Sequence, residues 1–413
     1  MIINTSLQVR PHWAGVTLAC LVAGASSCGE RSEVPPPFRV VAEDAFDLPL
    51  VGVTSQQRTL FNEGDRLFGL PFRPVDGLGP LYIRTACGAC HEEAGKGPGR
   101  VTKMAVVESD GLTPSADQSA LPWGHTQRPY FVAGATQPIA APTGVSLKLS
   151  NRIGPAVLGR GYIEAVADEE IVRVEAEQAS RTDGIRGRIN RVEHHSEANP
   201  DQPFHTLKKG DRNVMGRFGL KARSATLDDF TADAFMGDMG LTSLLRPVEP
   251  LNPDGLTDDE RPGVDLPLLT VNQVADYMRL IEIPARVPNA TGSALFARTG
   301  CDGCHVPSLR TRADYPIAQL AGIDAFIYSD LLLHDLGEGL ADGVVDEQAG
   351  SRDWRTAPLI GVRFMRNYLH DGRATSVEEA VLAHGGEAQM SVQHFKALSD
   401  SDRDVLLQFV QSL

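Results

Sequence analysis

The sequence predicts a mainly α-helical protein of two related domains, with long loops and a large insert in the first domain. Three observations support this prediction. A five-residue helical phrase occurs twice, at Gly64–Phe68 and Gly292–Phe296. Each copy is followed by the same cysteine motif, and each half closes with an amphipathic stretch. At 413 residues the chain has room for two or three domains.

The composition is that of a globular protein, with 42% apolar and 22% charged residues. Forty glycines and 27 prolines predict many loops. The net charge of −14 and the lack of a run of lysine or arginine argue against nucleic acid as a partner. A cationic partner is the better electrostatic match.

Residues 1–27 are expected to be an export signal. Arg10 precedes the apolar stretch Trp13–Ala25, which is too short to span a bilayer comfortably. Cys28 follows as in a bacterial lipoprotein signal, in which that cysteine carries a lipid anchor. Simple cleavage nearby is the alternative. Residues 28–45 are expected to form a linker.

The remaining cysteines form two copies of Cys-x-x-Cys-His, at Cys87–His91 and Cys301–His305. This spacing is the attachment signature of c-type haem. Two thiols about one helical turn apart can bond the haem vinyl groups while the adjoining histidine binds the iron. A redox dithiol or a zinc site also uses cysteine pairs, but neither requires a histidine at the same offset twice. We predict two covalently bound c-type haems, attached through Cys87, Cys90, Cys301 and Cys304, with proximal ligands His91 and His305.

The repeat also predicts where the domains divide. A helix is expected at Val271–Ile281, and another at Leu406–Leu413 after the capping-type run Ser399–Asp402. A haem-attachment helix followed by a closing helix is the cytochrome c plan. We therefore expect two cytochrome c-like haem domains, residues 46–285 and 286–413.

The Pro-containing stretch Glu282–Asn289 is expected to link the two domains. The first domain carries extra residues between its helical phrase and Cys87. It also carries a long stretch from His91 to Arg223 with few helical patterns. We expect this insert to form long loops and short strands covering one haem.

Several phrases resemble one known family. They are Gly77–Leu81, Arg217–Ala222, Phe235–Gly240, Tyr328–Asp335, Trp354-Arg355, Leu369–Arg373 and His384–Ala388. The chain resembles, over residues 45–413, the bacterial dihaem oxidoreductases classed as peroxidases and sometimes as thiol oxidoreductases. Asp353 departs from the longer Glu expected before Trp354. This family is similar to the dihaem cytochrome c peroxidases, in which one haem receives electrons and the other meets peroxide. The resemblance implies a periplasmic redox protein.

The resemblance also implies a sixth ligand for the second haem. In the peroxidase relatives, a methionine fourteen residues after the histidine of the phrase similar to Tyr368–Gly372 closes the electron-transfer haem. Here that position is His384. Met390 is a rival ligand, and a solvent-facing histidine is the alternative for His384. Two histidine ligands would lower the potential of this haem, because methionine ligation raises it.

The first haem has no matching ligand. The corresponding position is Leu251, which cannot bind iron. We expect an open face on which peroxide binds, unless a residue of the middle region closes it. The candidates, each of which has an ordinary surface or core residue as its alternative, are His125, His194, His195, His205, Met236 and Met239.

Peroxide cleavage needs a group that moves a proton and a charge that stabilises the departing oxygen. Glu164 is the candidate carboxylate, with a helix-start carboxylate as its alternative. His334 is predicted to be a buried imidazole near the haems, and a satisfied core histidine is the alternative. Arg355 and Arg373 are expected to neutralise haem propionates unless they are surface residues. Trp354 is either a core residue or an aid to electron transfer between haems.

These residues together predict a peroxidase-like oxidoreductase. Electrons would enter at the His305 haem and pass to an open haem at His91. The expected partners are a small cytochrome c as donor and hydrogen peroxide as oxidant. A non-catalytic dihaem electron carrier and a dihaem oxygenase are the alternatives. The missing ligand at Leu251 and the large insert favour the enzyme.

Overall fold

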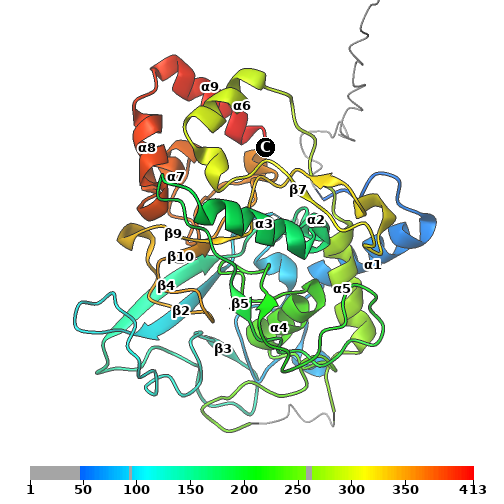
Figure 1. Cartoon of the computed structure of the whole chain (residues 1–413). Helices are drawn as coiled ribbons and strands as arrows, with labels where there is room; N and C mark the ends of the chain where they lie inside the picture. Colours follow the sequence, from blue (N-terminus) through cyan, green and yellow to red (C-terminus); the bar gives the residue numbers. More distant parts are fainter. Residues whose placement is uncertain (1–46, 93–94, 257–262) are drawn as a thin grey trace, which may run out of the picture. The chain divides into compact units, whose positions relative to one another are not determined.

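The computed structural model describes residues 47–92, 95–256 and 263–413. The predicted signal (1–27), the linker (28–45) and Cys28 lie outside these ranges. The described helices are α1 (Ser55–Gly69), α2 (Arg160–Ala165), α3 (Asp168–Ala179), α4 (Leu227–Met239), α5 (Leu268–Leu280), α6 (Ala290–Arg298), α7 (Val377–Ala383), α8 (Gln389–Lys396) and α9 (Asp400–Gln411). Figure 1 shows their arrangement.

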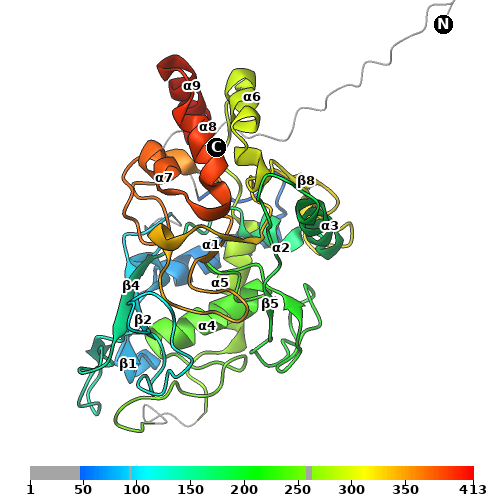
Figure 2. The same ribbon diagram turned by 60° about the vertical axis from the view of Figure 1, so that its left-hand side comes forward.

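The helices expected around the two motifs are confirmed. α1 and α6 contain the two copies of the repeated phrase, and α5 and α9 are the two closing helices. α1 packs against α5, and α6 packs against α9, as Figures 1 and 2 both show. The side chain of Ser399 accepts a hydrogen bond from the Asp402 N–H, which caps α9 as the sequence predicts.

A glycine allows each of these helix pairs to approach closely. A Cβ atom on Gly64 of α1 would lie 2.5 Å from the Cβ of Tyr277 in α5. A Cβ atom on Gly292 of α6 would lie 2.4 Å from the Cβ of Phe409 in α9. The duplicated phrase therefore needs its glycine for packing.

The prediction of a mainly α fold of two cytochrome c-like haem domains is wrong. Among the described residues, helix accounts for 33% and strand for 14%, with several small sheets. The sheets are two-stranded and antiparallel, and they pair β1 (Leu81–Tyr82) with β3 (Tyr130–Phe131), β2 (Arg100–Val106) with β4 (Leu147–Ile153), β5 (Arg191–Val192) with β6 (Val214–Met215), β7 (Leu309–Arg310) with β8 (Asp324–Ala325), and β9 (Leu333–Asp335) with β10 (Asp353–Arg355).

The long insert explains much of this difference. β2 and β4 pair over seven residues, from Arg100 opposite Ile153 to Val106 opposite Leu147. The insert also contains α2 and α3, which the sequence analysis did not predict. The sequence gives little local signal for these two strands. Each strand mixes charged and apolar residues, and its pairing partner is distant in the sequence.

Two hydrophobic clusters fill most of the interior. The larger one runs from Leu50 to Ile360 and includes side chains of α1, α4 and α5. The second is formed by residues from Leu295 onward, mainly of α6, α8 and α9. Residues 282–289 contain neither helix nor strand. The domain boundary at residue 285 stays a prediction. None of the described helices is long and apolar enough to cross a bilayer.

Candidate haem sites

The C-terminal motif begins with a tight turn that presents its histidine. Residues Cys301–Gly303 form a 3-10 turn, and the His305 N–H donates to the Cys301 carbonyl at 3.0 Å. The His305 Nδ1 lies 3.0 Å from the Tyr328 carbonyl oxygen. A carbonyl only accepts, so Nδ1 carries the proton and Nε2 keeps its lone pair. Burial lowers the pKa of His305 to about 4, so the imidazole is neutral and can bind a metal.

The N-terminal motif repeats this geometry. Cys87–Ala89 form the same turn, and the His91 Nδ1 lies 2.7 Å from the Pro155 carbonyl oxygen. Burial lowers the pKa of His91 to about 4. Phe68 of α1 packs 6.1 Å from the His91 ring, much as Phe296 of α6 packs 6.4 Å from His305. The duplication therefore extends to the orientation of both imidazoles.

In the absence of a metal ion, the four thiols are held in their protonated form. Burial raises the pKa of Cys87 to about 12 and that of Cys90 and Cys301 to about 11, and it also raises the pKa of Cys304. Thiolates are the reactive and zinc-binding form, and they are disfavoured here. The two cysteine pairs also line different cavities, so they do not form a joint four-cysteine site.

The first of these cavities surrounds the second motif, and we call it the C-terminal cavity. Its volume is about 270 Å³, and most of its lining is apolar. Several predicted site residues meet there, namely Cys301, Cys304, His305, His384, His334, Trp354 and Arg355. Met390 does not line it and is 48% exposed, so Met390 is not favoured as a ligand.

His384 ends α7 with its ring in this cavity. Its Nδ1 lies 2.7 Å from the Ala380 carbonyl oxygen, which again leaves Nε2 free to bind a metal. Burial lowers the pKa of His384. His305 and His384 are thus two half-buried, neutral imidazoles in one cavity.

The second cavity surrounds the first motif, and we call it the N-terminal cavity. Its volume is about 70 Å³, and Cys87, Cys90 and His91 line it. Of the candidate ligands, Met239 lines this cavity, whereas His125, His194, His195, His205 and Met236 do not. Leu251 is 69% exposed.

The sequence analysis missed three residues of the N-terminal cavity. Met278 reads as a core position of the amphipathic α5. Asp238, near the end of α4, is the one carboxylate among the described lining residues, and burial raises its pKa. Arg160 lines both cavities.

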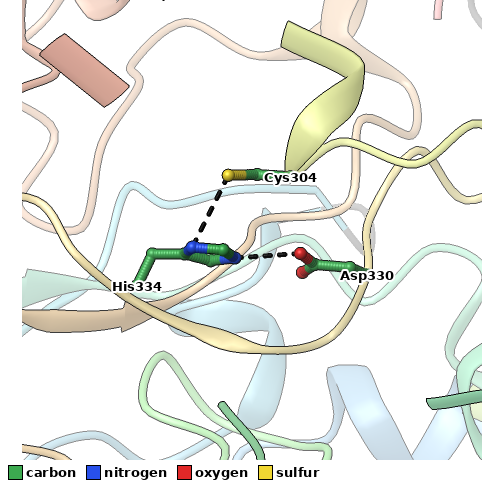
Figure 3. Close-up of side chains that lie close together, drawn as sticks. All are labelled: Cys304, Asp330 and His334. Atoms are coloured by element: carbon green, nitrogen blue, oxygen red, sulfur yellow. Dashed lines mark hydrogen bonds and ion pairs between the residues drawn. The ribbon is translucent and has the colours of Figure 1, made fainter. Parts of the chain in front are cut away.

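His334 lies between two carboxylates, Asp330 and Glu387. Figure 3 shows His334 with Asp330 and Cys304. The His334 Nε2 is 2.9 Å from Asp330, and its Nδ1 is 2.7 Å from Glu387 and 3.6 Å from the Cys304 Sγ. Ionised carboxylates only accept hydrogen bonds, so both ring nitrogens carry protons. Burial opposes this charge, but Asp330 raises the pKa of His334 well above its usual value. We call His334, Asp330 and Glu387 the imidazolium clamp.

Two residues of the imidazolium clamp, Asp330 and His334, form a group of three potential metal donors with Cys304. No other such group is found in the described ranges. The donor atoms of Cys304, Asp330 and His334 lie within 4.8 Å of one another. Neither Asp330 nor Glu387 was a predicted site residue, although both belong to phrases that carry the family resemblance.

Glu164 is placed away from both cavities. Its carboxylate accepts hydrogen bonds from Arg279 at 2.6 Å, from the Tyr315 hydroxyl at 2.8 Å and from the Leu227 N–H at 2.8 Å. Burial raises the pKa of Glu164, but Arg279 outweighs burial and holds it below the usual value. The catalytic role stays a prediction, and these contacts favour a structural role.

The two predicted propionate ligands differ. Arg355 is buried and lines the C-terminal cavity. Arg373 has a 49% exposed side chain, pairs with Asp371 at 2.6 Å and lines neither cavity. Trp354 is buried and stacks on His370 with ring centroids 3.9 Å apart. Trp354 lines the C-terminal cavity but not the N-terminal cavity.

The residues present fit an iron porphyrin. Each cavity offers two thiols, an adjoining imidazole with a free Nε2, and mainly apolar walls. Buried arginine is suited to the propionate carboxylates. The donor set therefore matches haem better than a bare metal ion.

Curated proteins and solved structures show little likeness to this chain. No curated protein matches the sequence. Hydrazine synthase of Kuenenia stuttgartiensis shares 12% identity at a TM-score of 0.36, over 97% of this chain and 100% of that one. A variant of the diheme peroxidase BthA of Burkholderia thailandensis shares 15% identity at a TM-score of 0.37, over 86% of this chain and 85% of that one. Neither likeness establishes a shared fold at these scores.

The family comparison covers more than half of the chain. Residues 144–413 match the family described as "Di-haem oxidoreductase, putative peroxidase". This range contains the C-terminal cavity's motif and the imidazolium clamp. The chain belongs to this family of di-haem oxidoreductases.

Proposed function

We propose that the protein is a peroxidase-like oxidoreductase with one c-type haem in each cavity. The haems are attached through Cys87 and Cys90, and through Cys301 and Cys304. The observation that carries this proposal is the repeated geometry of His91 and His305. Each imidazole is half-buried and neutral, and a backbone carbonyl fixes its Nδ1 so that Nε2 is available to iron.

The residues of the two cavities support different roles, electron entry in the C-terminal cavity and peroxide binding in the N-terminal cavity. A bound haem would supply one-electron redox chemistry at each site. His305 and His384 would both bind the iron of a haem in the C-terminal cavity and would close that site to substrate, as suits electron entry. The Leu251 position leaves the N-terminal site without a matching ligand, as suits peroxide binding. Electrons would pass from the C-terminal to the N-terminal site.

Asp238 replaces Glu164 as the proposed proton donor. Its carboxyl group lines the N-terminal cavity, and burial raises its pKa, so its proton is retained to higher pH than in water. A positioned acid of this kind protonates the leaving oxygen when the peroxide bond breaks. Glu164 lines neither cavity and is bonded to Arg279, which favours a structural role for it over the predicted catalytic one.

We place the protein in the periplasm, with or without a lipid anchor at Cys28. The apolar stretch Trp13–Ala25 supports export, and haem attachment to Cys-x-x-Cys-His motifs agrees with it. The net charge of −14 supports a basic donor such as a small cytochrome c.

A second candidate is a dihaem electron carrier without catalysis. The observation that favours it is the pair of thioethers, Met239 and Met278, in the lining of the N-terminal cavity. Either sulfur would close the first iron if it reached it.

One experiment separates the two candidates. Optical and electron paramagnetic resonance spectra are recorded on the ferric protein before and after one equivalent of hydrogen peroxide. The peroxidase predicts a high-spin signal that peroxide removes. Two low-spin signals that do not respond to peroxide, even after one-electron reduction, would leave the electron carrier. A protein that binds no haem would overturn both.

A further inference from the structure

Arg160 is a buried cation without an anion. It begins α2, is 8% exposed, and lines both the C-terminal and the N-terminal cavity. Its guanidinium donates one hydrogen bond, from Nη2 to the Ala156 carbonyl. Its other N–H groups meet no acceptor among the described residues. Five donors with a single neutral acceptor are an incomplete site.

Arg355 is likewise a buried arginine without a carboxylate partner in hydrogen-bond contact. It is 6% exposed and donates to two carbonyl oxygens, from Nε to Gly219 at 3.0 Å and from Nη1 to Thr356 at 3.2 Å. Asp330 is the one carboxylate that acts on it, and Asp330 is already bonded to His334. Arg355 and Arg160 are also near enough to repel each other, so the pair concentrates positive charge.

Three of the other four buried arginines among the described residues have carboxylate partners, whereas Arg128 donates only to the Gly237 carbonyl oxygen. Arg279 pairs with Glu164 at 2.6 Å, and Arg152 pairs with Asp342 at 2.6 Å. Burying a guanidinium without an anion is costly, and the cost appears in the pKa. Burial lowers the pKa of Arg160 to about 9 and that of Arg355 to about 10.

The position of Arg160 indicates which anion it binds. Pro155 and Arg160 line both cavities, so this short segment forms the wall between them. The same segment fixes His91, because the Pro155 carbonyl accepts from its Nδ1. An anion bound here would lie at the edge of whatever fills the two cavities. Carboxylate groups match a guanidinium in shape and charge.

We propose that Arg160 and Arg355 form one carboxylate-binding site for the haem propionates, in which Arg160 is shared by both haems. This inference rests on the proposed function, since it requires a haem in each cavity. Its consequence is electrostatic coupling. One guanidinium stabilises the reduced, more negative state of both irons, so its loss lowers both reduction potentials.

The test is redox titration of the intact, haem-loaded protein with optical and electron paramagnetic resonance detection of each haem. Arg160→Gln is expected to shift both midpoint potentials downward. Arg355→Gln is expected to shift mainly the haem of the C-terminal cavity. The matched control is Arg310→Gln, because Arg310 is exposed, pairs with Asp324 and lines neither cavity. It is expected to shift neither potential.

The outcomes separate this inference from the proposed function. Two haems per chain with unchanged potentials in Arg160→Gln would overturn the shared carboxylate site and leave the proposed function intact. Absence of haem from the wild-type protein would overturn the proposed function itself. If Arg160→Gln does not accumulate, Arg355→Gln decides, since an unchanged potential of the C-terminal haem also contradicts the site.

Discussion

At the scale of single residues, the imidazolium clamp makes stability depend on pH. The raised pKa of His334 means that the folded protein binds this proton more tightly than the unfolded chain does. The clamp therefore contributes fully below about pH 6.5, the value for an unfolded histidine, and its contribution is lost as the pH rises through the higher folded value.

We expect His334→Asn to lower the free energy of unfolding by about 3 kcal/mol near pH 6, because the buried carboxylate of Asp330 and the half-buried one of Glu387 lose their cation. The difference from wild type should shrink at alkaline pH. Thermal unfolding between pH 6 and 9 measures it. His195→Asn is the control, since His195 is exposed and its contact with Glu347 is 3.3 Å long. A difference that does not change with pH would show that His334 is uncharged.

Glu164→Gln tests whether Glu164 has a structural or a catalytic role. The change leaves Arg279 buried without its closest carboxylate, so the free energy of unfolding should fall by about 3 to 5 kcal/mol. Denaturant unfolding measures this loss, and peroxide turnover per folded molecule should be unchanged. Glu177→Gln is the control, because Glu177 pairs with Arg173 at the surface. A stable but inactive Glu164→Gln protein would restore the catalytic interpretation.

Asp238→Asn removes the proposed proton donor. The rate of reaction with peroxide should fall by about 100-fold or more, because general acid catalysis typically contributes 10²- to 10⁴-fold. Stopped-flow spectroscopy measures the rate, and the ferric spectrum reports whether the haem is intact. Asp314→Asn, at an exposed carboxylate, is the matched control. An unchanged rate would exclude Asp238 from the chemistry.

At the scale of elements, the helix pairs depend on two glycines. Gly292→Ala places a methyl group where Phe409 already lies, and Gly64→Ala does the same against Tyr277. Each should cost about 1 to 3 kcal/mol, although alanine is the better helix former. Gly237→Ala in α4 is the control, because a Cβ there meets nothing within 4 Å. Denaturant midpoints that rise in all three variants would contradict this packing.

The sequence predicts elements where the signal is local. α5 and α9 are visible because Val271 and Leu406 recur with other apolar residues at helical spacing. β2 and β4 are not visible, because each is defined by a partner 41 to 53 residues away. The site residues also fall into those that a local motif predicts and those that only the tertiary fold reveals. The motifs predict His91 and His305, but only the tertiary fold brings Arg160 to both cavities.

At the scale of the whole molecule, the C-terminal cavity makes stability depend on its occupant. An unfilled cavity costs about 24 cal/mol per Å³, so 270 Å³ corresponds to on the order of 6 kcal/mol. That is comparable with the whole stability of many proteins. The double variant Cys301→Ser, Cys304→Ser should therefore unfold at a much lower temperature. For Cys87→Ser, Cys90→Ser, beside the 70 Å³ cavity, on the order of 2 kcal/mol is expected. Circular dichroism melting compares them, and equal losses would contradict the argument.

The charged residues around Trp354 affect how easily its indole ring is oxidised. The Lys221 ammonium lies 4.3 Å from the indole centroid and Arg152 lies 5.5 Å from it, while His370 stacks on the ring. Positive charge over a π system stabilises its electrons. Asp342 lies 2.6 Å from Arg152 and 3.2 Å from Lys221, so its negative charge offsets part of this effect. In the proposed peroxidase, the positive charge that remains would oppose the loss of an electron from Trp354, and the wall of the C-terminal cavity would be less easily oxidised.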